Sequence, residues 1–74
     1  MAPRSKEANE RIKDERRGAI LLAALKIFTR KGFSAAKMSD ISEEANVSYG
    51  LVYHYFKSKE VVYLELIEHA INSL

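Results

Sequence analysis

The sequence contains no cysteine. This absence excludes a disulfide framework, a thiol nucleophile and a zinc site built from thiolates. Long apolar runs are also missing, because the longest covers only residues 19–25, whereas a helix needs roughly 20 apolar residues to cross a bilayer. The sequence shows no strand pattern, internal repeat or low-complexity segment. We therefore expect an all-α protein without a membrane partner.

Size and composition narrow the class of protein further. A chain of 74 residues forms one small domain with a modest core and leaves no room for a deep enzyme cleft. Its apolar content of 47% is ordinary for a folded chain. Residues 1–17 are polar and charged, unlike a signal peptide. We therefore expect a folded protein of a reducing cytoplasm that is not an enzyme.

The net charge of +2 is concentrated at the start of the chain. Residues 1–17 carry six basic and four acidic side chains, whereas residues 18–74 carry six of each. Residues 1–9 lack apolar periodicity, so we predict a flexible basic arm there. Arg4 and Lys6 of this arm are candidates for contacts with a nucleic acid, although most such arms are simply solvated.

Apolar spacing predicts a first helix from near Glu10 to Lys31. Its inner stripe repeats at three- and four-residue steps and consists of Ile20, Ala24, Ile27 and Phe28. Gly32 is expected to end this helix, because glycine readily adopts the left-handed backbone of a helix stop. Phe33 would then fold back onto the core.

The next segment has the pattern of two short helices joined by a tight turn. Ile41 and Ala45 lie one turn apart and share an inner face. Asn46 tolerates a left-handed backbone, Val47 is an apolar plug, and the Ser48 hydroxyl can cap the following helix. The two helices are expected over Met38–Ala45 and Tyr49–Tyr55.

The second of these helices has an unusual outer face. Val52 and Phe56, four residues apart, form its inner face. The residues left pointing outward or sideways are Tyr49, Gly50, Tyr53 and His54. Outward aromatic side chains are explained if this helix lies in a groove of DNA. Residues 37–56 are therefore predicted to form a helix-turn-helix motif.

Taken together, these residues resemble the DNA-binding domain of the TetR family of bacterial transcriptional regulators. The resemblance covers roughly residues 16–70 and depends on the order and spacing of five motifs: Ala24-Leu25-Lys26-Ile27-Phe28, Lys31-Gly32-Phe33, Asp40-Ile41, Val47-Ser48-x-Gly50 and Val52-Tyr53-His54-Tyr55-Phe56-Lys57-Ser58-Lys59-Glu60. The chain departs from the usual family pattern at Ala36, Lys37 and Leu51, where Thr or Ser is common, and at Asn46, where Gly is common. The resemblance implies a homeodomain-like, three-helix helix-turn-helix domain with a fourth, connecting helix, over residues 10–74.

The resemblance also implies DNA contacts for three aromatic side chains. In the family the phenol at the position of Tyr53 bonds a backbone phosphate; the alternative is a half-buried core tyrosine. Tyr55 stands where His is frequent and could reach a phosphate, although packing is an equally reasonable role. His54 stands where a second aromatic is usual and could donate to a phosphate or a base edge.

Residue chemistry adds the other contacts. Gly50 allows the backbone to approach DNA closely, and Tyr49 and Leu51 are the best candidates for reading bases, Leu51 through the thymine methyl group. Lysines and hydroxyls near helix starts are expected to meet phosphates, with Lys57 among them. Besides Lys57, the predicted contacts are Lys37, Ser39, Ser48, Tyr49, Gly50, Leu51, Tyr53, His54, Tyr55 and Lys59.

The fourth helix, capped by Ser58, is more apolar than a three-helix core requires. Its apolar residues are Val61, Val62, Leu64, Leu66, Ile67, Ala70, Ile71 and Leu74. In the resembling family this helix leads into a C-terminal domain that binds a small ligand and pairs two subunits. We therefore expect a largely monomeric fragment that lacks this domain. The alternative is a complete small protein with a self-association face.

One further pattern is set aside. Glu65, Glu68 and His69 lie close together on the fourth helix, but they do not complete a metal-ligand set, and a surface charge pattern explains them better. No cofactor or metal is expected.

The predicted function is sequence-specific binding of double-stranded DNA by a ligand-responsive bacterial regulator, most often a repressor in the family. A homodimer of the full-length protein would bind a palindromic operator, and a small-molecule effector would bind the absent domain. The protein would lie in the bacterial cytoplasm, associated with the nucleoid when bound to DNA. The alternative is a helical protein-interaction module that uses the apolar face of the fourth helix. Salt-dependent binding of duplex DNA would separate the two.

Overall fold

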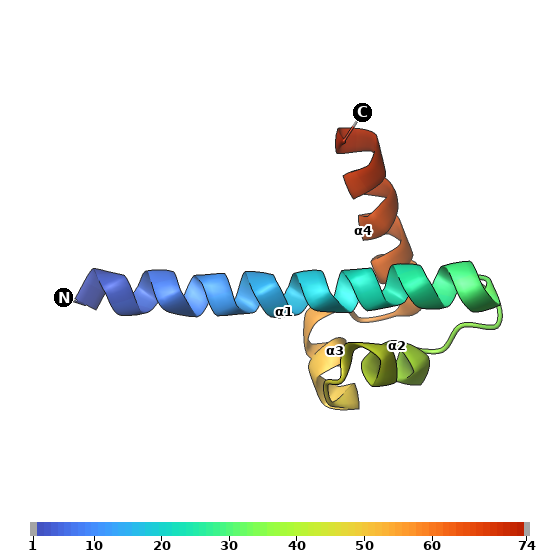
Figure 1. The fold of residues 1–74 in the computed structure, drawn as a ribbon, viewed down its shortest axis with the longest axis horizontal. Coiled ribbons are helices and arrows are strands. Elements are labelled where there is room, and N and C mark those ends of the chain that lie inside the picture. The colour runs from blue at the N-terminus through green and yellow to red at the C-terminus, as the bar shows by residue number, and fades with distance from the viewer. Residues whose placement is uncertain (1, 74) are drawn as a thin grey trace.

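The computed structural model describes the backbone of residues 2–73 and the side chains of residues 15–73. It contains four helices, which confirms the predicted all-α fold: α1 (Ala2–Lys31), α2 (Met38–Ala45), α3 (Tyr49–Tyr55) and α4 (Lys59–Asn72). Figure 1 shows α2 and α3 on one side of the C-terminal half of α1, with α4 crossing α1 and projecting on the other side. No helix in the described part of the chain is long and apolar enough to cross a membrane.

The start of α1 differs from the prediction. The apolar stripe indicated a start near Glu10, whereas the helix begins at Ala2. The stripe could not locate this start because a hydrophobic pattern marks only the turns of a helix that face a core. The side chains of Arg4 and Lys6 lie outside the described residues, and the function of residues 1–9 as an arm stays a prediction.

The end of α1 follows the predicted glycine stop. Gly32 has a φ of +83°, and its N–H donates to the carbonyl oxygen of Phe28 at 2.8 Å. Glycine is favoured there because a side chain with a Cβ rarely adopts this backbone conformation. Phe33 folds back as expected, and its ring centroid lies 5.6 Å from that of Phe28.

The turn between α2 and α3 is built by local chemistry. Asn46 has a φ of +57°, and the N–H of Val47 donates to the carbonyl oxygen of Ser42 at 3.0 Å, which closes the end of α2. The hydroxyl of Ser48 then accepts a hydrogen bond from the N–H of Leu51 at 3.1 Å. This cap satisfies a backbone donor at the start of α3 and confirms the predicted role of Ser48.

The core lies where all four helices meet. α1 contributes Ile20, Ala24 and Ile27 from the predicted stripe, and α2 contributes Ile41. The other large, fully buried side chains are Val52, Phe56 and Val62. Phe28, predicted for the same stripe, is only half-buried, because it lies at the edge of the core in a cluster with Phe33 and Tyr63.

Charged side chains join the helices around this core. On one side, Lys31 pairs with Asp40 at 3.2 Å and ties the end of α1 to the start of α2. On the other side, Arg17 pairs with Glu65 and ties α1 to α4. The guanidinium carbon of Arg17 also lies 5.0 Å from the centre of the Phe56 ring, so the same side chain covers the core.

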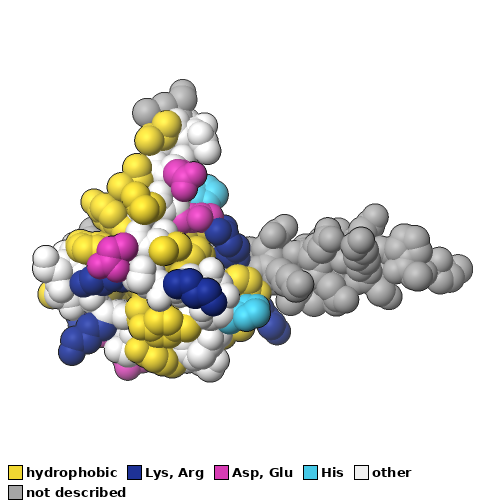
Figure 2. All heavy atoms as spheres, turned by 180° about the vertical axis from the view of Figure 1, so that it is seen from behind, with side chains coloured by type: hydrophobic (Ala, Val, Ile, Leu, Met, Phe, Trp, Pro, Cys, Tyr) yellow, Lys and Arg dark blue, Asp and Glu magenta, His cyan; other side chains and the backbone are white. Residues whose placement is uncertain are grey.

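Most of the apolar surface of α4 is exposed. Val62 is the one buried residue of α4 in the described structure, while Leu64, Ile67 and Ile71 are exposed. Figure 2 shows hydrophobic side chains gathered along the projecting helix. A shallow apolar hollow of about 280 Å³ lies between α1 and α4. The structure thus shows the excess of apolar residues on this helix that the sequence indicated.

Two adjacent valines of α4 test the extent of this core. Val62→Ala removes two methyl groups from a site with 0% exposure and should lower the free energy of unfolding by about 2 kcal/mol. Val61→Ala is the matched control, because Val61 is 41% exposed and the same change in helix propensity applies. Urea unfolding followed by circular dichroism measures both. Equal losses for the two variants would contradict the burial of Val62 in the core.

Candidate nucleic-acid interface

Helix α3 buries one face and exposes the other. Val52 is its one fully buried residue, while Tyr49, Gly50 and His54 are exposed. The capped turn at Ser48 holds α3 beside α2, and Figure 1 places both helices at the outer edge of the molecule. The structure therefore presents α3 as a surface helix whose outward residues are those that the sequence selected as DNA contacts.

Two tyrosines form a pair along this face. Their ring centroids lie 4.9 Å apart, and the Tyr49 hydroxyl donates to the Tyr53 hydroxyl at 3.3 Å. Tyr53 is half-buried and packs against the core, whereas 52% of Tyr49 is exposed. Packing against the core thus fixes the position of the Tyr53 ring, and contact with Tyr53 fixes that of the Tyr49 ring.

The hydrogen bond leaves the Tyr53 hydroxyl able to donate to a further group. Because the Tyr53 oxygen accepts from Tyr49, its own proton stays available to another acceptor, such as a phosphate oxygen. The contact with Tyr49 and burial raise the pKa of Tyr53, so the Tyr53 hydroxyl keeps its proton at neutral pH. The sequence indicated both residues but not their pairing, although a four-residue spacing on a helix is a signal for it.

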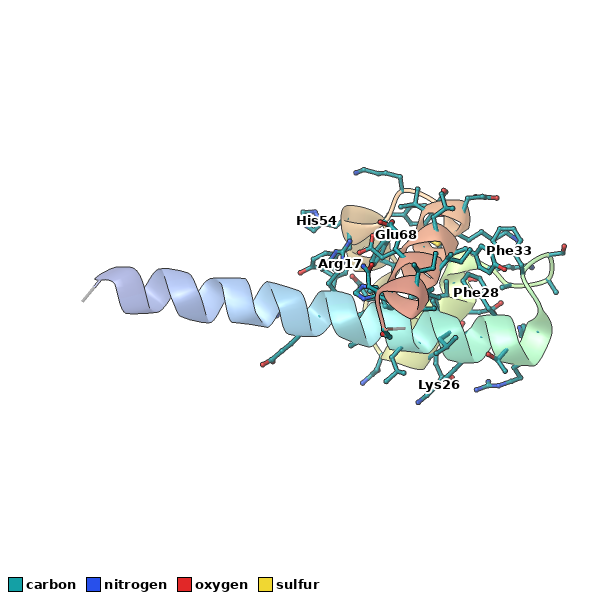
Figure 3. All side chains as sticks on the ribbon, turned by 90° about the horizontal axis from the view of Figure 1, so that it is seen from above. Arg17, Lys26, Phe28, Phe33, His54 and Glu68 are labelled. Carbon is teal, nitrogen blue, oxygen red and sulfur yellow. The ribbon has the colours of Figure 1, made fainter. Side chains whose placement is uncertain are left out.

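The two aromatic residues after Tyr53 have different surroundings. His54 is exposed, and Figure 3 shows its ring projecting away from the helices. Tyr55 is half-buried and packs against the core, with its ring centroid 5.2 Å from that of His54 in an edge-on arrangement. Tyr55 therefore packs against the core and supports the His54 ring, and its contact with a phosphate stays a prediction.

The front of α3 is open at Gly50. A Cβ placed on Gly50 would meet no other described atom within 4 Å, so another surface can approach the backbone there. Leu51 beside it is half-buried, and Ser48 is exposed although its hydroxyl accepts from Leu51. Gly50 and Ser48 thus lie on the accessible surface, whereas only part of Leu51 does.

Helix α2 starts with two further residues that the sequence selected. Lys37 is exposed, and Ser39 is half-buried in the first turn. The backbone N–H of Lys37 donates to a carboxylate oxygen of Asp40 at 3.0 Å, which fixes the start of the helix. This role of Asp40 was not predicted, although an acidic residue three positions after a helix cap is a known signal for it.

Lys59 has surroundings that differ from those expected of a phosphate contact. Its ammonium group donates to three carbonyl oxygens of the loop between α1 and α2, namely those of Phe33 at 2.7 Å, Ser34 at 3.1 Å and Ala36 at 3.1 Å. Lys57, two residues earlier, is exposed. Sequence spacing could not reveal the contacts of Lys59, because its partners lie 23 to 26 positions away.

The acidic and histidine residues of α4 form no metal centre. His69 Nε2 lies 3.9 Å from a carboxylate oxygen of Glu65, which also pairs with Arg17. Among the residues whose side chains the structure describes, no group of three potential ligands comes together. The carboxylate of Glu65 instead links α4 to α1.

Comparison with known proteins agrees with this arrangement. The model of a family described as bacterial regulatory proteins, tetR family, matches residues 20–66. The chain is 36% identical over 70 residues to the HTH-type transcriptional activator FasR of Mycolicibacterium smegmatis, a match that covers 95% of this chain and 32% of that protein. It is 38% identical over 56 residues to the HTH-type transcriptional repressor NicS of Pseudomonas putida, with coverage of 76% and 26%.

A third relative is named neither an activator nor a repressor. The chain is 46% identical over 56 residues to the HTH-type transcriptional regulator YfiR of Bacillus subtilis, which covers 76% of this chain and 27% of that protein. The chain thus spans about a third or less of the length of each of these relatives. The shared part is the segment that contains the helix-turn-helix.

The anchoring of α2 by Asp40 predicts a pH dependence. The side chain of Lys31 and the N–H of Lys37 hold the pKa of Asp40 below its ordinary value. A carboxylate with a lowered pKa stabilises the folded state at neutral pH, and this contribution disappears as the pH falls through the lowered value. Asp40→Asn should therefore lower the free energy of unfolding at pH 7, by an amount that shrinks below about pH 4.

Glu43→Gln is the matched control, because Glu43 is an exposed carboxylate of the same helix and forms no ion pair within residues 15–73. Urea unfolding at a series of pH values measures all three proteins. A deficit of Asp40→Asn that stayed constant from pH 7 to pH 3 would contradict the charge-based anchoring.

Proposed function

The chain belongs to the tetR family of bacterial regulatory proteins, and from this premise we propose that it binds double-stranded DNA in a sequence-specific manner as part of a transcriptional regulator. Family membership makes the chain part of a regulator and not an enzyme. The observation that carries the proposal is the outward face of α3, where exposed Tyr49 and His54 flank the open backbone at Gly50.

In the proposed complex, α3 lies in the major groove. This is the usual position of the second helix of a helix-turn-helix motif. Tyr49 and the exposed part of Leu51 would then face base edges, and Gly50 would let the helix approach the groove closely. The free proton of the Tyr53 hydroxyl supports a hydrogen bond to a phosphate on the groove wall.

Phosphate contacts from the neighbouring segments complete the proposed interface. Lys37 at the start of α2 and Lys57 between α3 and α4 are both exposed. Ser39 in the first turn of α2 adds a hydroxyl near the sugar-phosphate backbone. Such contacts set the orientation of the protein, whereas contacts to bases determine which sequence it prefers.

We further propose that the whole regulator acts as a homodimer on a palindromic operator in the bacterial cytoplasm. Dimeric helix-turn-helix proteins bind half-sites roughly 34 Å apart, one turn of the duplex. An effector would bind the larger remainder of such a protein and change the spacing of the two α3 helices.

One relative is named an activator and another a repressor. We propose that the regulator acts as a repressor. The test is a reporter gene placed behind an operator that is selected from random duplexes: its expression should rise when the regulator gene is deleted.

The first test of DNA binding is its dependence on salt. Duplex affinity should fall steeply as salt increases, and Lys57→Ala should reduce the slope of that dependence by about one unit, as loss of one phosphate contact does. Lys26→Ala is the control, because Lys26 is exposed on α1 and projects to a different side of the molecule from His54. Fluorescence anisotropy with a labelled duplex measures both. Absence of duplex binding, or affinity that ignored salt, would favour the alternative of a protein-interaction module.

The second test concerns sequence preference. Tyr49→Ala should change the ranking of duplexes selected from a random pool, because it removes a side chain proposed to face the bases. Tyr63→Ala removes an equally large aromatic that is 42% exposed on α4 and should leave the ranking unchanged. Sequencing of the bound duplexes gives the ranking. Identical rankings for wild type and Tyr49→Ala would remove Tyr49 from the base-reading set.

A further inference from the structure

Lys59 is the first residue of α4, and its side chain reaches back to the loop that connects α1 to α2. Its ammonium nitrogen lies 2.7 to 3.1 Å from the carbonyl oxygens of Phe33, Ser34 and Ala36. The same nitrogen lies 4.6 Å from the centre of the Phe33 ring. The side chain is only half-exposed. No other lysine described in the structure has such an enclosed set of partners.

We propose that Lys59 is a positioning residue, which holds the first turn of α2 against the DNA through the loop carbonyls and does not itself bind phosphate. This inference rests on the proposed DNA-binding function. It replaces the role that the sequence suggested for Lys59 and assigns the phosphate contact at this end of α3 to Lys57.

The hydrogen-bonding capacity of the ammonium group is the first argument. A lysine ammonium has three N–H donors and no acceptor. Three carbonyl oxygens lie within hydrogen-bond distance, so every donor has a partner in the folded protein. A direct bond to a phosphate would require the release of a carbonyl in a partly buried place, where an unsatisfied polar group is unfavourable.

The backbone of the loop gives the second argument. Residues 33–36 belong to no helix, and one backbone hydrogen bond, from the N–H of Ala36 to the carbonyl of Gly32 at 3.1 Å, closes the loop. The carbonyls that Lys59 binds come directly before Lys37, whose N–H is anchored on Asp40. Lys59 therefore supplies the bonds that fix the path of the chain into α2.

The third argument is the position of the two segments that Lys59 connects. One is the start of α4, and the other is the segment that leads to Lys37 and Ser39, both proposed to face the DNA backbone. Without the three bonds, the loop could adopt other paths. It would then lose conformational entropy when DNA binds, and this loss would oppose binding. Removal of Lys59 should therefore weaken DNA binding without removing a charge contact.

Substitution by arginine separates the two roles. Arginine keeps the positive charge and binds phosphate at least as well as lysine, but its planar fork cannot place three donors on three converging carbonyls. Lys59→Arg and Lys59→Met should both weaken duplex binding by roughly tenfold, with the slope of affinity against salt unchanged. The matched pair is Lys57→Arg, which should bind like wild type, and Lys57→Met, which should lose about one unit of slope.

A double-mutant cycle distinguishes positioning from a general loss of stability. All variants are measured at a temperature where circular dichroism shows them fully folded, in the protein at its natural length. Lys37→Ala should weaken binding several-fold in the wild-type background. It should have almost no effect in the Lys59→Met background, because Lys37 is then no longer held in position against the DNA. An equal effect of Lys37→Ala in both backgrounds would overturn the proposal, as would wild-type binding by Lys59→Arg.

A measurement without DNA separates this inference from the proposed function. Hydrogen exchange at the backbone amides of residues 36–41 should be faster in Lys59→Met than in wild type, whereas Lys57→Met should leave it unchanged. If wild type and every variant failed to bind duplex while this faster exchange was still seen, the proposed function would be refuted and the positioning of the loop by Lys59 supported. Unchanged exchange in Lys59→Met would refute the positioning of the loop by Lys59.

Discussion

The burial of one apolar stripe on α1 is the constraint on which the other three helices depend. Helices α2 and α3 have eight and seven residues, and helices this short are not stable alone in water. They persist because Ile41 and Val52 bury their side chains against Ile20, Ala24 and Ile27. The outward face of α3 therefore has a fixed position only because its inward face has a partner.

Local chemistry made much of this fold predictable. The bounds of α2 and α3, the glycine stop at Gly32 and the caps at Ser48 and Ser58 are set by residues within four positions of each other, and such signals can be identified in a sequence. The early start of α1 could not be predicted, because its first turns carry no apolar face. The ties through Arg17 and Lys59 also escaped prediction, because each joins segments distant in the chain.

The candidate interface was predictable to a similar degree. A helical period places Tyr49 and His54 opposite Val52, so their exposure follows from the sequence once the helix is accepted. The orientation of each polar group does not follow in this way. The Tyr49 hydroxyl is directed at Tyr53, and the Lys59 ammonium is directed at a loop on the other side of the motif, and both depend on the packed structure.

The attachment of α4 has a mechanical consequence. Besides the burial of Val62 in the core, two polar contacts fix the helix, those of Lys59 with the loop carbonyls and the Arg17–Glu65 pair, which are about 9 Å apart along its axis at 1.5 Å per residue. Residues 67–72 are exposed beyond the second point and form an overhang of similar length. A sideways load on this overhang acts as a torque, which the two attachment points must balance with forces in opposite directions. The Arg17–Glu65 pair, nearer the overhang, would carry the larger of the two forces, and the Lys59 contacts would transmit the smaller, opposite force to the α1–α2 loop.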